Sequence, residues 1–405
     1  MSIYDRFGVT PLINATGSVT RLGGAPMPPE VLAAFHEAAG EACSLEQLQA
    51  AASREISRHT GADAGLVTAG CAAGLTLGTA AILAELDLGK MERLPRVADG
   101  RCEFLIAREQ RSGYDHAVRA AGGTLVEVGF NEIVSNAGVR RTEVWEYLAA
   151  LTDKTAGIVY VAAPDSRPRL ADLVQAAQAR ALPVLVDAAG EVLPRRSIPE
   201  LVATGADLIA FSGGKAIRGP QSTGVLCGRA MLIMSAGLQM LDMDDHPELW
   251  NPPAPWIEKS LLPGIPRHGI GRGFKVSKEE IAALLVALDL FYSGAYDAWR
   301  PRYLSWLEDI AAAVPALSQT RLLNPTDGER FPTLEVRVDE THLNRSAYDV
   351  CRSLRHGSPP IYVGHGQLSE GVLVIHPLCL TEERAGIIAR RLVEELSPAP
   401  AESPR

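Results

Sequence analysis

Short apolar segments alternate with amphipathic or alanine-rich segments through the middle of the chain. Most of the apolar segments lack alternating polar positions, which is typical of strands buried on both faces of a sheet. They are Glu103–Ala107, Thr124–Val128, Gly157–Val161, Pro183–Asp187, Asp207–Phe211 and Thr223–Cys227. The helix-like stretches between them include Tyr114–Ala121, Arg141–Ala150 and Arg169–Ala179. This alternation predicts an α/β fold in which helices cover both faces of a mainly parallel sheet.

The alternation stops after about residue 230. A polar, proline-rich stretch from Asp242 to Pro266 follows and predicts an extended loop or lid. A helical pattern then runs from Lys275 to about Tyr292, and beyond it strand-like segments are interleaved with helices. These strand-like segments are Thr333–Val338, Ile361–Gly364 and Val372–Ile375. The pattern predicts a second, smaller α/β domain at the C-terminal side.

The length of 405 residues suits two or three domains, at about 100–200 residues per domain. We expect an N-terminal segment over residues 1–60 and a large domain over residues 61–268. The smaller domain, including its connecting helix, is expected over residues 269–396. The segment 397–405 (SPAPAESPR) has the composition of a disordered tail.

The charge balance disfavours nucleic acid as a partner. The chain has 48 acidic and 39 basic residues and a net charge of −9, and it contains no dense run of Lys or Arg. An acidic surface repels the phosphate backbone of nucleic acids. The N-terminus lacks the pattern of a signal peptide, and no segment approaches the ~20 apolar residues of a membrane helix. We therefore expect a cytoplasmic protein with no membrane contact.

The six cysteines are scattered singly along the chain. None forms a CxxC pair, and none has the spacing to His that zinc sites require. They are Cys43, Cys71, Cys102, Cys227, Cys351 and Cys379. This distribution is typical of small core residues in a reducing compartment, and no metal site is expected.

The most informative motif, SGGKAIRGPQ at Ser212–Gln221, directly follows an apolar segment. Lys215 within it is either a surface lysine in a glycine-rich turn or a lysine that forms a Schiff base. In the second case its amine is partly desolvated, and the glycines let the backbone approach a bulky cofactor. Ser212, three residues earlier, is then placed to donate its hydroxyl to a phosphate.

Two further features favour the second interpretation of Lys215. Asp187 ends the apolar segment PVLVD, and the carboxyl ends of such strands are where α/β sheets bind ligands. In an enzyme that uses pyridoxal phosphate (PLP), such a carboxylate pairs with the pyridinium nitrogen and makes the ring an electron sink. The alternative for Asp187 is a helix cap or a loop carboxylate. The small-residue turn Thr68–Leu75 precedes a helix-like segment and predicts an anion site at a helix N-terminus.

Several motifs together resemble the fold type I PLP-dependent enzymes, in the branch of bacterial selenocysteine synthase and D-glucosaminate-6-phosphate ammonia-lyase. The matching segments are INATG (13–17), AGCAAGL (69–75), YDHAVRAAG (114–122), VDAAGEVLP (186–194), FSGGKAIRGPQSTGVLCG (211–228) and GIGRGFKVSKEEI (269–281). The resemblance implies the fold type I transferase fold, PLP as the cofactor, and a homodimer or an assembly of dimers with active sites at the subunit interface.

The resemblance also implies roles for individual residues. Lys215 is expected to bind PLP and move the substrate proton, and Asp187 to hold the pyridinium. The remaining expected cofactor-binding residues are Gly70, Cys71 and Ala72 through their backbone, Ser212, Gln110 and Thr223. The expected substrate-binding residues are Arg218, Arg272 and Lys275; each of these three cations alternatively makes a structural ion pair.

Two positions depart from the pattern of the family. Where a His or an aromatic ring is expected over the PLP face, the chain has Gln110, and Tyr114 is the other candidate unless it belongs to the core. Where an Arg is expected in the last strand of the small domain, the chain has His376, for which a structural role is the simpler interpretation.

The preferred hypothesis is a lyase that eliminates from a small hydroxylated or sugar-derived amino acid and gives a 2-oxo acid and ammonia. A racemase would need a second acid–base group opposite Lys215, and the sequence identifies none. A selenocysteine synthase-like transferase acting on charged tRNA conflicts with the acidic charge. A non-catalytic PLP-binding scaffold conflicts with the presence of both Lys215 and Asp187.

Overall fold

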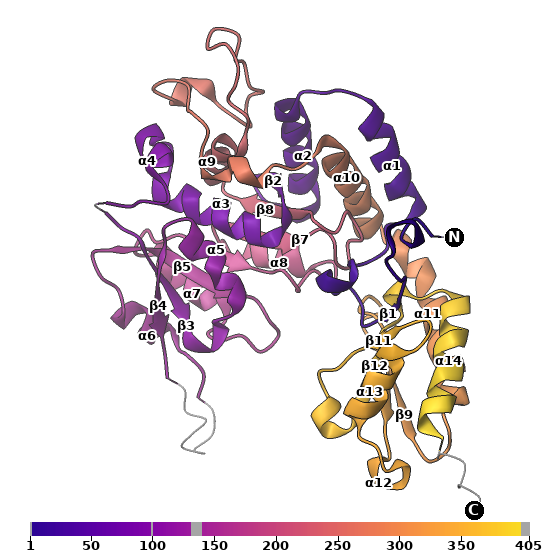
Figure 1. The fold of residues 1–405 in the computed structure, drawn as a ribbon. Coiled ribbons are helices and arrows are strands. Elements are labelled where there is room, and N and C mark those ends of the chain that lie inside the picture. Colours follow the sequence, from indigo (N-terminus) through magenta and orange to yellow (C-terminus); the bar gives the residue numbers. More distant parts are fainter. Residues whose placement is uncertain (1, 99, 131–139, 398–405) are drawn as a thin grey trace, which may run out of the picture. The chain divides into compact units, whose positions relative to one another are not determined.

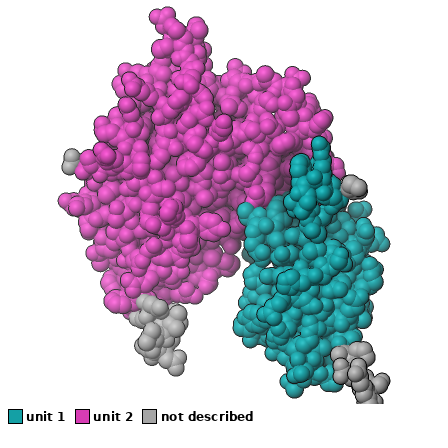
Figure 2. All heavy atoms as spheres, viewed as in Figure 1, with its two compact units in different colours: residues 1–26, 294–405 teal, residues 27–293 magenta. Residues whose placement is uncertain are grey.

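The chain forms two compact units in the computed structural model (Figure 1). The residues that the structure describes are 2–98, 100–130 and 140–397. The larger unit is residues 27–293, and the smaller unit combines residues 1–26 with residues 294–405 (Figure 2). Residues 398–405 of the expected tail lie outside the described residues.

A seven-stranded sheet forms the centre of the larger unit. In spatial order its strands are β2 (Ala64–Thr68), β8 (Gly224–Gly228), β7 (Leu208–Ser212), β6 (Val184–Asp187), β5 (Thr155–Val161), β3 (Glu103–Ala107) and β4 (Thr124–Val128). β8 runs antiparallel to both of its neighbours, and every other pair is parallel. The predicted mainly parallel α/β sheet is therefore confirmed.

The helices of the larger unit pack around this sheet. They are α1 (Pro29–Gly40), α2 (Leu45–Thr60), α3 (Gly70–Ala84), α4 (Leu88–Arg93), α5 (His116–Ala120), α6 (Val144–Ala149), α7 (Leu170–Gln178), α8 (Ser197–Ala203), α9 (Ala230–Met240) and α10 (Lys278–Tyr292). The predicted helix Tyr114–Ala121 begins later than expected, because a 3₁₀ turn occupies Gly113–Asp115.

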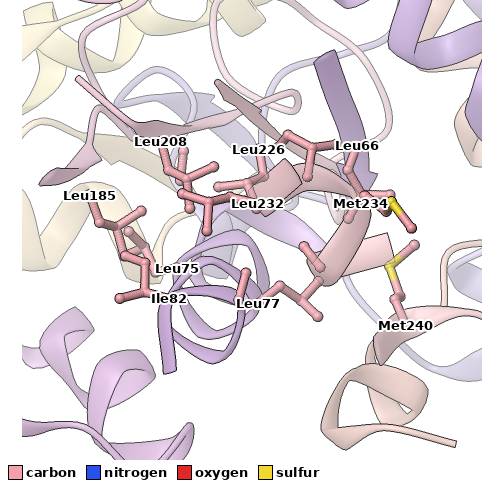
Figure 3. Packing of buried hydrophobic residues seen from close by; sticks show 14 of the residues in the cluster. Leu66, Leu75, Leu77, Ile82, Leu185, Leu208, Leu226, Leu232, Met234 and Met240 are labelled. Atoms are coloured by element: carbon pink, nitrogen blue, oxygen red, sulfur yellow. The ribbon is translucent and has the colours of Figure 1, made fainter. Parts of the chain in front are cut away.

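Helix α3 lies against β7 and β8 and beside α9. Figure 3 shows Leu75 of α3 beside Leu185, with Leu208 and Leu226 on the adjoining strands of the sheet. A Cβ added at Gly78 of α3 would lie 3.0–3.4 Å from the methyl groups of these three leucines of the sheet. The absence of a side chain at Gly78 therefore lets α3 approach the sheet closely, and this close packing fixes the position of the helix N-terminus.

The polar stretch from Asp242 to Pro266 is mainly loop, as predicted. Three of its apolar side chains are almost fully buried in the core of the larger unit: Trp250, Trp256 and Ile257. A 3₁₀ turn, η7 (Ile270–Phe274), follows it and leads into α10. The stretch is thus an anchored connection between α9 and α10.

The smaller unit has its own core and two small sheets. Strands β12 (Val372–Ile375), β10 (Thr333–Arg337) and β9 (Gln319–Leu323) form an antiparallel sheet, and β1 (Ile13–Ala15) pairs in parallel with β11 (Ile361–Val363). The helices of this unit are α11 (Arg300–Ala313), α12 (Glu340–Leu343), α13 (Ala347–His356) and α14 (Glu382–Leu396).

The observed units divide the chain differently from the expected domains. Residues 1–26 belong to the smaller unit because β1 pairs with β11. Residues 269–293 belong to the larger unit because α10 packs against α1 and α2. Among the described residues, no single helix has the length and apolar composition needed to cross a membrane, although one consecutive pair, Lys278–Tyr292 with Ala295–Ala313, meets these criteria jointly.

Candidate active site

Asp187 and the loop that carries Lys215 lie at the same edge of the central sheet. Asp187 is the last residue of β6, and its register partner on β7 is Ala210. Ser212 ends β7, and Lys215 follows three residues later. Because β6 and β7 are parallel neighbours, both carboxyl ends meet at one edge, which is where α/β sheets bind ligands.

Backbone hydrogen bonds hold the Lys215 loop in a compact shape. The N–H of Gly213 donates to the carbonyl of Thr223, and the N–H of Gly219 donates to the carbonyl of Gly213, both at 2.9 Å. The N–H of Arg218 donates to the carbonyl of Lys215 at 3.0 Å. A Cβ at Gly214 would lie 2.5 Å from the Cα of Gln221, so this position requires glycine. The glycines beside Lys215 therefore allow the two ends of the loop to pack closely against each other.

The N-terminus of α3 reaches the same edge of the sheet. Gly70 begins the helix with a φ of +85°, and no side chain among the described residues caps this end. A Cβ at Gly224 of β8 would lie 2.3–2.7 Å from backbone atoms of Gly70 and Cys71, which shows how closely β8 and the start of α3 pack. The first-turn N–H groups of this 15-residue helix form an electropositive end suited to an anion.

The side chain of Cys71 contacts Asp187. The thiol Sγ lies 3.6 Å from Oδ1 of Asp187, and the N–H of Ala189 donates to the same oxygen at 3.0 Å. Burial, the charge of Asp187 and a hydrogen bond to Asp187 together raise the pKa of the Cys71 thiol well above its usual range, while the charge of Lys215 lowers it. Cys71, Asp187 and Lys215 are thus electrostatic neighbours. The sequence interpretation assigned only the backbone of Cys71 and missed its side chain, since a single cysteine carries no signal of its contacts.

Two of the residues expected to bind the cofactor form hydrogen bonds with backbone groups of the protein. The hydroxyl of Thr223, which is fully buried, donates to the carbonyl of Pro220 at 2.7 Å. The Gln110 amide accepts from the N–H of Val161 at 2.9 Å and donates to the carbonyl of Arg167 at 3.3 Å. Tyr114 has 69% of its surface exposed, so the core alternative for this residue is wrong.

Two expected substrate-binding residues line a cavity of about 520 Å³ whose lining includes neither Lys215 nor Asp187. Arg272 forms an ion pair with Asp242, and Lys275 is exposed. Glu280, which also lines this cavity, accepts a hydrogen bond from Ser222 of the Lys215 loop. The cavity is therefore connected to that loop through one side-chain contact.

The third expected substrate-binding residue, Arg218, lies inside the Lys215 loop. It is 4% exposed and has a φ of +62°, which is uncommon for a residue with a side chain. Strained backbone of this kind often marks a functional loop.

His376 has a structural environment in the smaller unit. Its Nδ1 accepts from the N–H of Leu378 at 3.2 Å, and its ring lies 5.1 Å from the ring of Phe331. Burial lowers the pKa of His376 to about 4, so the ring is neutral near pH 7 and carries no charge for an anion. These contacts agree with the structural interpretation of this histidine.

The groups at the sheet edge fit PLP. A buried carboxylate ends β6, a lysine follows the end of β7, and an uncapped helix N-terminus lies beside them. These three protein groups match the three chemical groups by which PLP is bound: its pyridinium nitrogen, its aldehyde and its phosphate.

The chain shares its fold with solved structures. The structure of D-glucosaminate-6-phosphate ammonia-lyase matches with a TM-score of 0.80 and 28% identity, covering 98% of each chain. A serine palmitoyltransferase from S. paucimobilis with PLP and myriocin bound matches with a TM-score of 0.53 over 95% of this chain, and its 12% identity shows the fold alone. The fold and the residues at the sheet edge make the chain a PLP-dependent enzyme of fold type I.

Residues 12–241 match the family described as SelA: L-seryl-tRNA selenium transferase. The chain belongs to this family, which confirms the branch that the sequence motifs indicated.

Several relatives match nearly the whole chain, among them two enzymes with different names. The D-glucosaminate-6-phosphate ammonia lyase of Salmonella typhimurium is 28% identical over 97% of each chain. The 5'-C-glycyluridine monooxygenase-decarboxylase of a Streptomyces species is 29% identical over 97% of this chain and 92% of the relative. The chain is thus similar to enzymes whose names describe different reactions.

Proposed function

We propose that the chain is a PLP-dependent ammonia-lyase that converts a β-hydroxylated, sugar-derived amino acid into a 2-oxo acid and ammonia. The placement of Asp187 and the Lys215 loop at the ends of adjacent parallel strands carries this proposal. The full-length likeness to D-glucosaminate-6-phosphate ammonia-lyase supports the substrate class.

The residues that would hold PLP each have a defined task. Asp187 would pair with the ring nitrogen, and Lys215 would bind the aldehyde carbon through Nζ. The N–H groups of Gly70, Cys71 and Ala72 would hold the phosphate, with the hydroxyl of Ser212 added. Bound PLP supplies an electron sink for the carbon next to the substrate amine.

Lys215 would then move the protons of the reaction. Its amine takes the proton from Cα, and general acid–base help of this kind contributes about 10²–10⁴-fold. The electron pair of the broken C–H bond forms a Cα–Cβ double bond as the β-hydroxyl leaves. Lys215 returns the proton to this hydroxyl, which departs as water. Hydrolysis of the resulting enamine gives the 2-oxo acid and ammonia.

A substrate panel tests the proposed reaction. The purified protein is incubated with PLP and with D- and L-hydroxy amino acids and aminosugar acids, each with and without a phosphate. Release of ammonia and a 2-oxo acid in equal amounts is the expected result. Reversible accumulation of pyridoxamine phosphate without ammonia would show a transaminase, and inversion of Cα without ammonia would show a racemase.

The family description makes selenium transfer the second candidate. The acidic net charge of −9 disfavours a tRNA substrate. Seryl-tRNA and a selenium donor belong in the same panel. Formation of selenocysteinyl-tRNA, with no ammonia from any free amino acid, would replace the lyase assignment.

We further propose that Lys275 and Arg272 bind an anionic group of the substrate. Lys275 has no ion-pair partner within the part of the chain that the structure describes, so its ammonium is available. Lys275→Ala should raise KM for a phosphorylated substrate about 10–100-fold, because hydrogen bonds to charged groups contribute about 1.5–3 kcal/mol. Steady-state kinetics check this, with Arg267→Ala, a nearby cation outside the cavity lining, as the matched control. An unchanged KM in the Lys275 variant would exclude this role.

We also propose a cytoplasmic homodimer with shared active sites. The cavity beside Arg272 and Lys275 includes neither Lys215 nor Asp187, so in a dimer these cations would serve the site of the second copy. When the Lys215→Ala and Lys275→Ala variants are mixed, subunit exchange should give dimers in which one site has both lysines, Lys215 from one subunit and Lys275 from the other. Turnover with a low KM should then be restored. Sedimentation as a monomer, or no restoration after subunit exchange, would contradict the shared site.

A further inference from the structure

The thiol of Cys71 and the carboxylate of Asp187 come together from distant parts of the chain. Cys71 is the second residue of α3, and Asp187 ends β6. Their Sγ and Oδ1 atoms lie 3.6 Å apart, and both residues are 8% exposed. The contact is a thiol donating to a carboxylate oxygen inside the site, at the point where α3 begins.

Both hydrogen-bond donors at Asp187 use the same oxygen. Oδ1 accepts from the thiol of Cys71 and from the N–H of Ala189. Within residues 2–98, 100–130 and 140–397, no group donates a hydrogen bond to Oδ2. An ionised carboxylate can accept at both oxygens. Protein groups therefore hold Oδ1 of Asp187 in place, and Oδ2 is left to accept a hydrogen bond from a bound ligand.

The thiol stays a donor in the working pH range. Burial and the charge of Asp187 hold the pKa of Cys71 well above its usual range, against the opposing effect of Lys215. A thiolate at this place would put a second negative charge 3.6 Å from Oδ1. The S–H form instead donates to Oδ1, and a weak donor leaves most of the negative charge of the carboxylate in place.

We infer that Cys71 is a positioning residue, whose thiol orients Asp187 so that Oδ2 would be left to accept from the N–H of the cofactor ring. This inference rests on the proposed role of Asp187 as the partner of the ring nitrogen. A simple core cysteine would fill space without a directed polar contact. Here the sulfur bonds to the functional carboxylate, and the second donor, the N–H of Ala189, converges on the same oxygen.

The infrared S–H stretching band of the cofactor-free protein tests the contact itself. An S–H group that donates to a carboxylate absorbs at lower frequency than a free thiol. The low-frequency component should disappear in Cys71→Ala and shift upward in Asp187→Asn, since an amide oxygen is the weaker acceptor. Cys351, buried in the smaller unit, provides the matched control, because Cys351→Ala should leave that component unchanged. A band unaffected by Cys71→Ala and by Asp187→Asn overturns the inference.

The pH titration of the bound cofactor's absorbance tests the positioning role. Cys71→Ala should move the titration midpoint and weaken PLP binding about two- to fivefold, the effect of one weak hydrogen bond of about 0.5–1 kcal/mol. Cys71→Ser, which keeps a donor, should restore the midpoint toward that of the unaltered protein. If the midpoint is unchanged in Cys71→Ala but altered in Asp187→Asn, the inference about Cys71 is refuted and the proposed role of Asp187 is kept. A midpoint unchanged in Asp187→Asn as well refutes the proposed role of Asp187.

Discussion

Replacement of Lys215 by alanine should lower ammonia release by at least about 10²–10⁴-fold, the contribution of a positioned acid–base group. The loss follows because Lys215 would both hold the cofactor and move the substrate proton. The fold should persist, since Lys215 lies in a loop whose shape is set by backbone hydrogen bonds between its neighbours. Single-turnover kinetics and circular dichroism measure the two effects separately.

The exposed Lys154 offers a matched control for this substitution, and Lys154→Ala should leave turnover unchanged. A small primary amine added to Lys215→Ala should restore part of the lost rate, because it replaces the missing base. Turnover of Lys215→Ala within a few-fold of the unaltered protein would show that another group moves the proton.

Asp187→Asn should lower turnover about 10–100-fold while the fold is kept. The amide oxygen of asparagine can still accept from Ala189, but its NH₂ group cannot accept from a ring N–H. The ring nitrogen then loses its partner, and a hydrogen bond to a charged group is worth about 1.5–3 kcal/mol. The rate of ammonia release, compared with PLP affinity from fluorescence titration, measures the loss.

Asp207 provides the control for Asp187, because it directly precedes β7 at the opposite edge of the same sheet. Its carboxylate accepts from Arg229 and from the N–H of Val184, both at 2.8 Å. Asp207→Asn should lower the free energy of unfolding with little change in turnover per folded molecule. Equal loss of turnover in both variants would mean that Asp187 acts through stability alone.

Most strands of the central sheet were predictable because burial on both faces leaves an uninterrupted apolar run, although β4 is largely exposed or half-buried. Strand direction was not predictable, since β8, buried along its whole length, has the same composition as its parallel neighbours although it runs antiparallel. β9 was missed because its residues are mostly exposed. β1, only three residues long, was missed because its partner β11 lies almost at the other end of the chain.

The residues of the candidate site differed in how far sequence could predict them. Asp187 and Lys215 were selected as candidates because strand ends and glycine-rich turns have local signatures, and their roles remain predictions. Gln110 was identified as a cofactor residue, but the structure places its amide between two backbone groups, a contact that spans 51 residues to Val161. The contact of Cys71 with Asp187 spans 116 residues and likewise has no local signature.

Borohydride reduction of the holoenzyme, followed by proteolysis and mass mapping, shows whether Lys215 is the residue that binds the cofactor. Reduction converts a cofactor bound at a lysine into a stable secondary amine, so the modified peptide identifies that lysine. A phosphopyridoxyl group is expected on Lys215 and on no other lysine. A phosphopyridoxyl group on a different lysine, or none after incubation with PLP, would contradict it.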